Sequence, residues 1–122
     1  MDFAYNDEQK EIIKVVRDLV EKEIVPYASE MDETGKLHEG LLEKLAAQGL
    51  LGVAIPEEFG GAGLDAITIA AIYEELGKGC AGVATTVAAN ALASYPVIIA
   101  GNDDQKKRYF DIINEDNLAA FA

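Results

Sequence analysis

The chain has 122 residues, of which 50% are hydrophobic, so it is long and apolar enough to bury the core of one ordinary domain. Its 22 acidic and 10 basic side chains give a net charge of −12. This charge repels phosphate backbones and anionic lipid, which excludes nucleic acid and membrane surfaces as expected partners.

The cysteine content and the N-terminal sequence both indicate an intracellular protein. Cys80 is the only cysteine, so neither a disulfide framework nor a cysteine-rich metal site is expected within the chain. The opening residues, MDFAYNDEQKEII, lack the apolar stretch of a signal peptide and the arginine-rich character of a transit peptide. We therefore expect a cytoplasmic protein, or a mitochondrial matrix protein from which a transit peptide has been removed.

The first helix is expected to begin after Asn6, because residues 6–9 fit a capping box with acidic residues in the first turn. Apolar residues then recur at helical spacing, namely Ile12, Val16, Leu19 and Val20. Pro26 lacks the N–H that would continue the hydrogen-bond ladder, so it is expected to break or bend this helix. The helix is expected to continue on a new axis over residues 27–31.

A second helix is predicted over about residues 38–48, ending at Gly49. Its buried face consists of Leu41, Leu42 and Leu45. The next segment, LLGVAIPEEFGGAGLD at residues 50–65, contains several glycines and a proline and is therefore predicted to be a loop. Within it, only residues 51–55 have any strand character.

Asp65 is expected to cap a third helix that ends at Gly77 and Gly79. The predicted inward face of this helix is Ala66, Ile69, Ala70, Tyr73 and Leu76. Glu74 and Glu75 are expected on the solvent-facing side, because carboxylates adjacent in sequence point in different directions on a helix and are normally solvated.

The stretch from Cys80 to Asn102 contains no Asp, Glu, Lys or Arg and predicts a helix over residues 81–100 that ends at Gly101. A helix that is apolar on all sides lies either in a protein core or in a membrane. Alanine contributes little to membrane insertion, Asn90 would cost free energy in lipid, and no Trp or Lys flanks the stretch. We therefore expect a buried core helix.

Residues 102–105 form a second capping box, which predicts a last helix to about Ile113 with Tyr109, Phe110 and Ile113 facing inward. The final residues, NLAAFA, are an apolar run with strand character. Together these elements predict an all-α domain. It has up to six helices in an orthogonal or bundle-like array around the buried helix at residues 81–100.

One face of the helix at residues 81–100 is the main candidate for a site. Ala84, Ala88, Leu92 and Tyr95 share this face by helical spacing. Small residues there either let neighbouring helices approach closely or leave a groove for a ligand, and the residues alone favour close packing. Pro96 has no N–H to donate to the Leu92 carbonyl, so a kink in the helix is expected near Leu92.

The other chemistry-bearing residues favour structural roles. His38 is the only histidine and has no partner in a recognisable motif, Cys80 is expected to be a buried small residue, and FGGAGLD is typical of a tight turn. The residues themselves predict neither a metal site nor a self-contained catalytic constellation.

Three segments in order carry a family resemblance: IPEEFGGAGLD, then EELGKG, then GCAGVATTVAANALASYPVIIAGNDDQKKRYF. They resemble the N-terminal helical domain of acyl-CoA dehydrogenases, and the similarity extends over the whole chain. The resemblance implies a subunit roughly three times this length, with a middle β-domain and a C-terminal helical domain. It also implies FAD as cofactor, an electron-transfer flavoprotein as partner, acyl-CoA as substrate and a homotetrameric parent.

The resemblance further implies that this chain lines part of the acyl-chain pocket. The implied wall is Ala84, Val87, Ala88, Leu92 and Tyr95, with Ala89 as a further candidate. Alanine at positions 84 and 88 departs from the larger polar residues of some medium-chain members and suggests a deeper or wider cavity. The catalytic glutamate and the flavin-binding motifs are expected outside these 122 residues. The isolated chain is therefore expected to be inactive.

Two alternatives remain open at this stage. The domain could be a non-catalytic helical binding or interaction module, or it could belong to a related enoyl-CoA reductase that runs the same chemistry in reverse. Flavin-contacting motifs in the residues that follow in the parent protein would separate the enzyme from the binding module.

Overall fold

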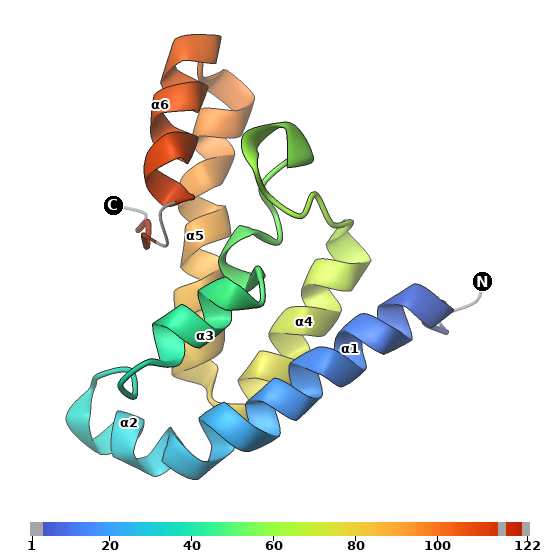
Figure 1. Ribbon diagram of the computed structural model, residues 1–122, viewed down its shortest axis with the longest axis vertical. Helices are drawn as coiled ribbons and strands as arrows, with labels where there is room; N and C mark the ends of the chain where they lie inside the picture. The colour runs from blue at the N-terminus through green and yellow to red at the C-terminus, as the bar shows by residue number, and fades with distance from the viewer. Residues whose placement is uncertain (1–3, 115–116, 121–122) are drawn as a thin grey trace.

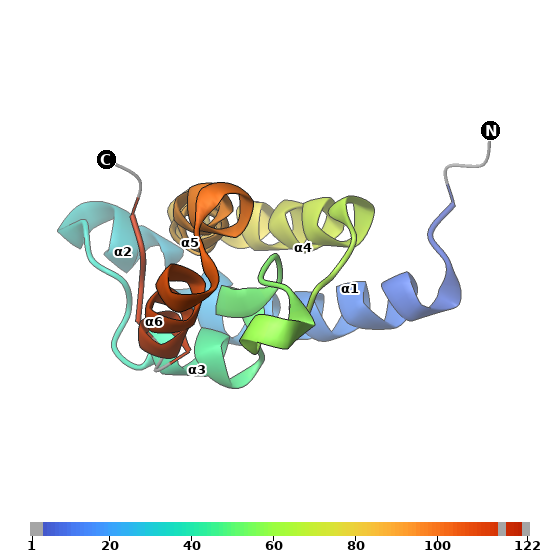
Figure 2. The same cartoon turned by 90° about the horizontal axis from the view of Figure 1, so that it is seen from above.

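The computed structural model describes residues 4–114 and 117–120, and within these residues the fold is all-helical, as predicted. The described residues form six α-helices: α1 (Asp7–Leu19), α2 (Ala28–Thr34), α3 (Leu41–Ala47), α4 (Ala66–Gly79), α5 (Ala81–Ala100) and α6 (Asp103–Ile113). Figure 1 shows α1 running beside α4, and α4 and α5 diverging from a shared corner. Seen from above, α2, α4 and α5 form one layer and α1, α3 and α6 the other (Figure 2).

Local capping places the helix starts where the sequence predicts them. The Asn6 side chain accepts a hydrogen bond from the backbone N–H of Gln9 at 2.8 Å, and the Gln9 side chain accepts one from the backbone of Asn6 at 3.0 Å. Asn102 and Gln105 repeat this reciprocal pair at 2.9 and 3.0 Å. Both capping boxes are thus confirmed, and each satisfies N–H groups that the helix itself leaves without partners.

Pro26 interrupts the first helix as predicted. After α1 the chain forms one π-helical turn at Val20–Ile24 and one 3-10 turn at Val25–Tyr27 before α2 begins. The wider π turn accommodates a residue that cannot donate a backbone hydrogen bond. Gly79, at the end of α4, packs directly on this turn. A Cβ built there would lie 2.5 Å from Cγ1 of Val20, so only glycine permits the close approach without displacing Val20.

The loop at residues 50–65 is folded back on itself and does not form a strand at residues 51–55. It contains 3-10 turns at Leu50–Gly52 and Glu57–Phe59. Its two arms are joined by backbone hydrogen bonds of 2.9 to 3.1 Å: Ala62 N to Gly52 O, Leu64 N to Val53 O and Gly63 N to Ile55 O. A Cβ on Gly61 would lie 2.0 Å from the Ile55 carbonyl oxygen, so the arms can meet only if this residue is glycine.

Two buried clusters hold the helices together. The larger joins α1, α3, α4 and α5 with the loop, and its fully buried members include Ile24, Leu41, Leu45, Ile72, Leu76, Val83 and Val87. The smaller holds α6 to the loop, through Ile55, Phe110 and Ile113. Phe59 stacks on Phe110 with 4.8 Å between ring centroids, which extends the smaller cluster toward the surface.

The predicted inward face of α4 is correct at Leu76, which is buried, but wrong at the other four positions. The residues that α4 buries are Thr68, Ala71, Ile72, Glu75 and Leu76, whereas Ala66 and Ala70 are exposed and Ile69 and Tyr73 are half-buried. Because α4 is apolar over most of its circumference, hydrophobic spacing alone does not select the face that meets α1 and α5. The face of α4 that was predicted to point inward lies largely on the outside of this domain.

The expectation that Glu75 is solvated is also wrong. Glu75 is only 5% exposed and accepts hydrogen bonds from Arg17 Nε at 3.0 Å, Arg17 Nη2 at 2.9 Å and Lys78 Nζ at 2.7 Å. Hydrogen bonds from Arg17, with a further one from Lys78, hold the pKa of Glu75 at about 2 even though burial acts in the opposite direction. The pair ties α1 to α4 at a point where an unpaired carboxylate would be strongly destabilising.

The helix α5 is buried on one face only, not all round as expected. Val83, Val87, Asn90, Ala91 and Ser94 are buried, whereas Leu92 is 53% exposed and Ile99 is 81% exposed. Within the described residues α5 is the one helix that is long and apolar enough to cross a membrane by length and composition. It packs against α4 and the loop and buries two polar side chains, Asn90 and Ser94.

Residues 117–120 have no regular structure, so the predicted C-terminal strand is absent from the described part of that run; Phe121 and Ala122 lie outside it. This segment is nevertheless held in place, because the Ala119 N–H donates to Oδ1 of Asn90 at 2.6 Å. The same Asn90 side chain donates through Nδ2 to the Leu51 carbonyl at 3.3 Å.

The Glu75 ion pair predicts a specific pH dependence of stability. Since the pKa of Glu75 falls from the ordinary 4.5 to about 2 on folding, its contribution is complete above pH 4.5 and is lost as the pH falls to 2. Glu75→Gln should lower the free energy of unfolding by about 1–3 kcal/mol at pH 7. Chemical denaturation of both proteins should show this difference shrinking between pH 4.5 and pH 2.

Glu74→Gln is the matched control, because Glu74 is exposed and contacts only Lys78, at 3.0 Å. Its effect at pH 7 should stay within about 0.5 kcal/mol. Equal effects of the two substitutions would show that the Glu75 pair does not hold α1 to α4.

Candidate functional site

The face of α5 predicted to form a site points away from the main core. Ala88 is half-buried, and Leu92 and Tyr95 are exposed. Val87 lies on the other side of the helix, 1% exposed and packed in the main core. The structure therefore brings Ala88, Leu92 and Tyr95 together on one surface and separates Val87 from them.

The surroundings of this face differ along the length of α5. Near the corner with α4, a Cβ on Gly77 would lie 3.9 Å from Cβ of Ala84, so the two helices pack closely there. Farther along, the helices diverge and the loop enters between them (Figure 1). Close packing, one of the two alternatives left open by the sequence, is therefore observed at Ala84, and open space lies farther along, beside Tyr95.

That open space is a hollow of about 420 Å³ between α4, α5 and the loop, which we call the α4–α5 hollow. Tyr95 lines it from α5, and the remaining lining residues are Ala54, Leu64, Ala66, Ile69, Ala70 and Tyr73. Four of the five residues of α4 that were predicted to face the core are in this lining. The lining contains no carboxylate, histidine, lysine or arginine, so the hollow is suited to an uncharged, largely apolar ligand.

Tyr73, in the lining of the α4–α5 hollow, carries a buried polar group. Its hydroxyl oxygen is buried and has no hydrogen-bond partner among the described residues. Burial, and to a lesser extent the neighbouring Tyr95, raise the pKa of Tyr73 to about 12. At neutral pH the Tyr73 phenol is therefore protonated and can donate a hydrogen bond.

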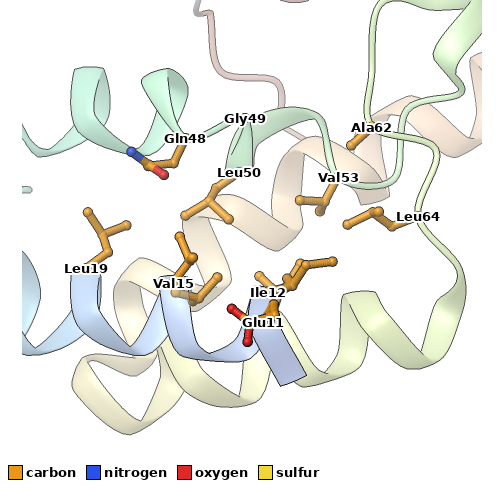
Figure 3. Close-up of a pocket in the computed structure, with 12 residues that line it drawn as sticks. Glu11, Ile12, Val15, Leu19, Gln48, Gly49, Leu50, Val53, Ala62 and Leu64 are labelled. Carbon is orange, nitrogen blue, oxygen red and sulfur yellow. The ribbon is translucent and has the colours of Figure 1, made fainter. Parts of the chain in front are cut away.

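A second pocket, which we call the α1 pocket, lies between α1 and the loop and has a volume of about 320 Å³. Figure 3 shows Ile12, Val15 and Leu19 of α1 opposite Leu50 and Val53, with Glu11 and Gln48 as polar neighbours. Leu64 lines both this pocket and the α4–α5 hollow.

The α1 pocket was not predicted from the sequence. The available signal was the width of the apolar surface on α1, where Ile12, Val15 and Leu19 lie beside the buried stripe of Ile13, Val16 and Val20. One core needs only one stripe, so a second apolar stripe indicates another contact surface.

The remaining candidates make local packing contacts. The His38 ring stacks on Tyr27 with 3.5 Å between centroids, and its Nδ1 lies 3.3 Å from Oε1 of Glu30. Cys80 is half-buried against the main core at the start of α5. Among residues 4–114 and 117–120, no group of three or more His, Cys, Asp or Glu side chains is placed to hold a metal ion.

Comparison with known proteins gives a consistent result. Residues 6–114 match the family model described as the acyl-CoA dehydrogenase N-terminal domain. A 3-(aryl)acrylate reductase of Clostridium sporogenes is 37% identical over 119 residues, which is 94% of this chain and 31% of that protein. A solved acyl-CoA dehydrogenase of Bacillus anthracis, complexed with FAD, is 34% identical with a TM-score of 0.82, over 97% of this chain and 20% of that chain.

A further solved structure is described as the electron transferring flavoprotein of Acidaminococcus fermentans, in work on flavin-based electron bifurcation. It is 32% identical with a TM-score of 0.84, over 94% of this chain and 30% of that chain. The chain spans only 29% to 31% of the length of the curated relatives that it matches first.

Proposed function

Because this chain belongs to the acyl-CoA dehydrogenase family, as its N-terminal domain, we propose that it builds part of the acyl-chain pocket of a longer, FAD-dependent enzyme acting on acyl-CoA thioesters. The observation that carries the proposal is the α4–α5 hollow, whose lining is uncharged and largely apolar. Of the residues that were predicted to form the pocket wall, Tyr95 lines it. An alkyl chain placed there would gain stability by leaving water.

This chain contributes binding and exclusion of water to the reaction, and not the reacting groups. Dehydrogenation removes a proton and a hydride from adjacent carbons of the acyl group, which requires a base and a hydride acceptor. The hollow has no carboxylate or histidine to act as the base and no cation to meet the pyrophosphate of FAD. We therefore assign no residue of this chain to the cofactor or to the base.

The reverse reaction, reduction of an enoyl-CoA, is the second candidate, and the similarity to the Clostridium sporogenes reductase favours it. Both directions need the same apolar wall, because the acyl chain is common to the substrate and the product. Flavin bleaching by saturated acyl-CoAs supports dehydrogenation, whereas oxidation of reduced flavin by enoyl-CoAs supports reduction.

The proposed pocket predicts a change in chain-length preference in the full-length enzyme. Ala88→Phe should fill space along the wall and shift the preferred substrate toward shorter acyl chains, with at least about a tenfold loss of kcat/KM for the longest good substrate. A panel of acyl-CoAs, followed by flavin bleaching, measures the shift. The control is Ala47→Phe, which places the same side chain at an exposed position of α3. An unchanged profile in Ala88→Phe refutes the pocket wall.

Because the base and the cofactor site are assigned to other parts of the enzyme, the isolated 122 residues should neither retain FAD nor convert acyl-CoA. After incubation with FAD and desalting, the protein should show no flavin absorbance and no turnover. Retained flavin bands would contradict the assignment of the cofactor site to other parts of the enzyme.

The α1 pocket is the second functional surface that we propose, as a docking site for an electron-transfer flavoprotein. The acyl chain would use the α4–α5 hollow, and the α1 pocket is a second, mainly apolar hollow that is open to a partner. Its walls are aliphatic, and Val15 at its edge is 53% exposed. An aliphatic or aromatic anchor side chain from a partner fits this chemistry. The likeness to the Acidaminococcus fermentans structure supports this class of partner.

Val15→Glu in the full-length enzyme should separate docking from chemistry. A carboxylate in the α1 pocket should slow reduction of the electron-transfer flavoprotein at least about tenfold, while anaerobic reduction of the enzyme's own flavin by substrate is unchanged. Stopped-flow measurements distinguish the two steps. Val25→Glu is the control, because Val25 is 52% exposed and does not line the pocket. Equal slowing by both variants would indicate a general charge effect.

A further inference from the structure

Two polar side chains of α5, Asn90 and Ser94, are fully buried, and they use their hydrogen bonds differently. The Ser94 hydroxyl donates to the Asn90 carbonyl of its own helix at 2.6 Å. Both hydrogen bonds of the Asn90 side chain leave the helix: Nδ2 donates to the Leu51 carbonyl at 3.3 Å, and Oδ1 accepts from the Ala119 N–H at 2.6 Å. Asn90 therefore joins α5 to two segments that are distant from it in sequence.

The two partners of Asn90 belong to parts of the chain on which the placement of an acyl group would depend. Leu51 lies in the loop that contributes two residues to the lining of the α4–α5 hollow. Ala119 lies in residues 117–120, from which the polypeptide would continue toward the reacting groups in the longer enzyme of the proposed function. One carboxamide thus ties the side of the hollow to the path that leads to those groups.

The position of residues 117–120 depends on few interactions, because this segment has no regular secondary structure. Among the described residues, two hydrogen bonds hold it. Asn117 Nδ2 donates to the Ile112 carbonyl of α6 at 2.7 Å, and the Ala119 N–H donates to Asn90. Only the second of these bonds reaches α5, the helix that carries the predicted pocket wall. It is therefore the bond that sets this segment against the wall.

We propose that Asn90 is a positioning residue for the reaction. Through its hydrogen bond to Ala119 it holds the continuing polypeptide at a fixed place relative to the hollow, so that the bound acyl chain is aligned with the reacting groups of the longer enzyme. This inference rests on the proposed function. Asn90 is buried and does not line the hollow, so its loss should slow the chemical step and leave the affinity for substrate nearly unchanged.

The test uses the full-length enzyme and two substitutions that remove the same hydrogen bond from opposite ends. Asn90→Leu removes the acceptor, and Ala119→Pro removes the N–H donor. In anaerobic stopped-flow measurements with acyl-CoA, each variant should lower the limiting rate of hydride transfer to the flavin at least about tenfold, because a misplacement of about 1 Å can cost about 100-fold in rate. The dissociation constant of the acyl-CoA should stay within about threefold of the wild-type value.

A double variant shows whether Asn90 acts through Ala119. Because both substitutions remove one bond, the double variant should be no more than about twofold slower than Asn90→Leu alone. If Asn90→Leu does not fold, the rate and the dissociation constant of Ala119→Pro decide the question by the same criteria.

Asn114→Leu is the matched control, because Asn114 also joins two elements through its carboxamide, which donates to the Phe59 carbonyl at 2.7 Å. It has no described hydrogen bond to α5 or to residues 117–120, so the limiting rate should stay within about twofold. Amide hydrogen exchange gives a readout that does not depend on activity. Residues 117–120 should exchange at least about tenfold faster in Asn90→Leu than in the wild type or in Asn114→Leu.

The outcomes separate this inference from the proposed function. A folded Asn90→Leu enzyme with a wild-type limiting rate overturns the inference and leaves the acyl pocket intact. Additive effects of Asn90→Leu and Ala119→Pro, or a loss confined to substrate affinity, overturn it as well. A wild-type enzyme that neither oxidises acyl-CoAs nor reduces enoyl-CoAs overturns the proposed function, and this inference with it.

Discussion

The position of the central helix relative to the rest of the domain depends on one buried carboxamide. Asn90 lies in the middle of α5, and its side chain donates to the Leu51 carbonyl at 3.3 Å and accepts from the Ala119 N–H at 2.6 Å. Three segments that are distant in sequence therefore meet at one fully buried group. A buried amide is stable only when its hydrogen bonds are made, so it fixes α5, the loop and the C-terminal segment in one arrangement.

The loop between α3 and α4 forms one side of the α4–α5 hollow. Its arms are joined by backbone hydrogen bonds, and Gly61 lets them approach where a Cβ would meet the Ile55 carbonyl. The loop enters between α4 and α5 where they diverge, and it contributes Ala54 and Leu64 to the α4–α5 hollow. The hollow is thus bounded by backbone that is hydrogen-bonded within itself, and not by loosely held side chains.

The sequence allows the helix boundaries to be predicted well, but not the faces that the helices bury. Capping is local, so Asn6, Asp65 and Asn102 locate three helix starts without tertiary information. The inward face of α4 depends on which neighbouring elements the helix packs against. Because α4 is apolar over most of its circumference, its sequence pattern does not indicate which face that is. Glu75 is the clearest case, because its burial depends on Arg17, which lies 58 residues away in the chain.

The two proposed sites share one side chain, which has a consequence for how they communicate. Leu64 lines both the α4–α5 hollow and the α1 pocket. Dense packing transmits displacement through a shared side chain, because there is little free volume to absorb it. If an occupied hollow shifts Leu64 and changes the affinity of the pocket for its partner, thermodynamic linkage requires the partner to change the affinity of the hollow by the same factor. The domain would then act as a two-way coupling element between substrate and redox partner.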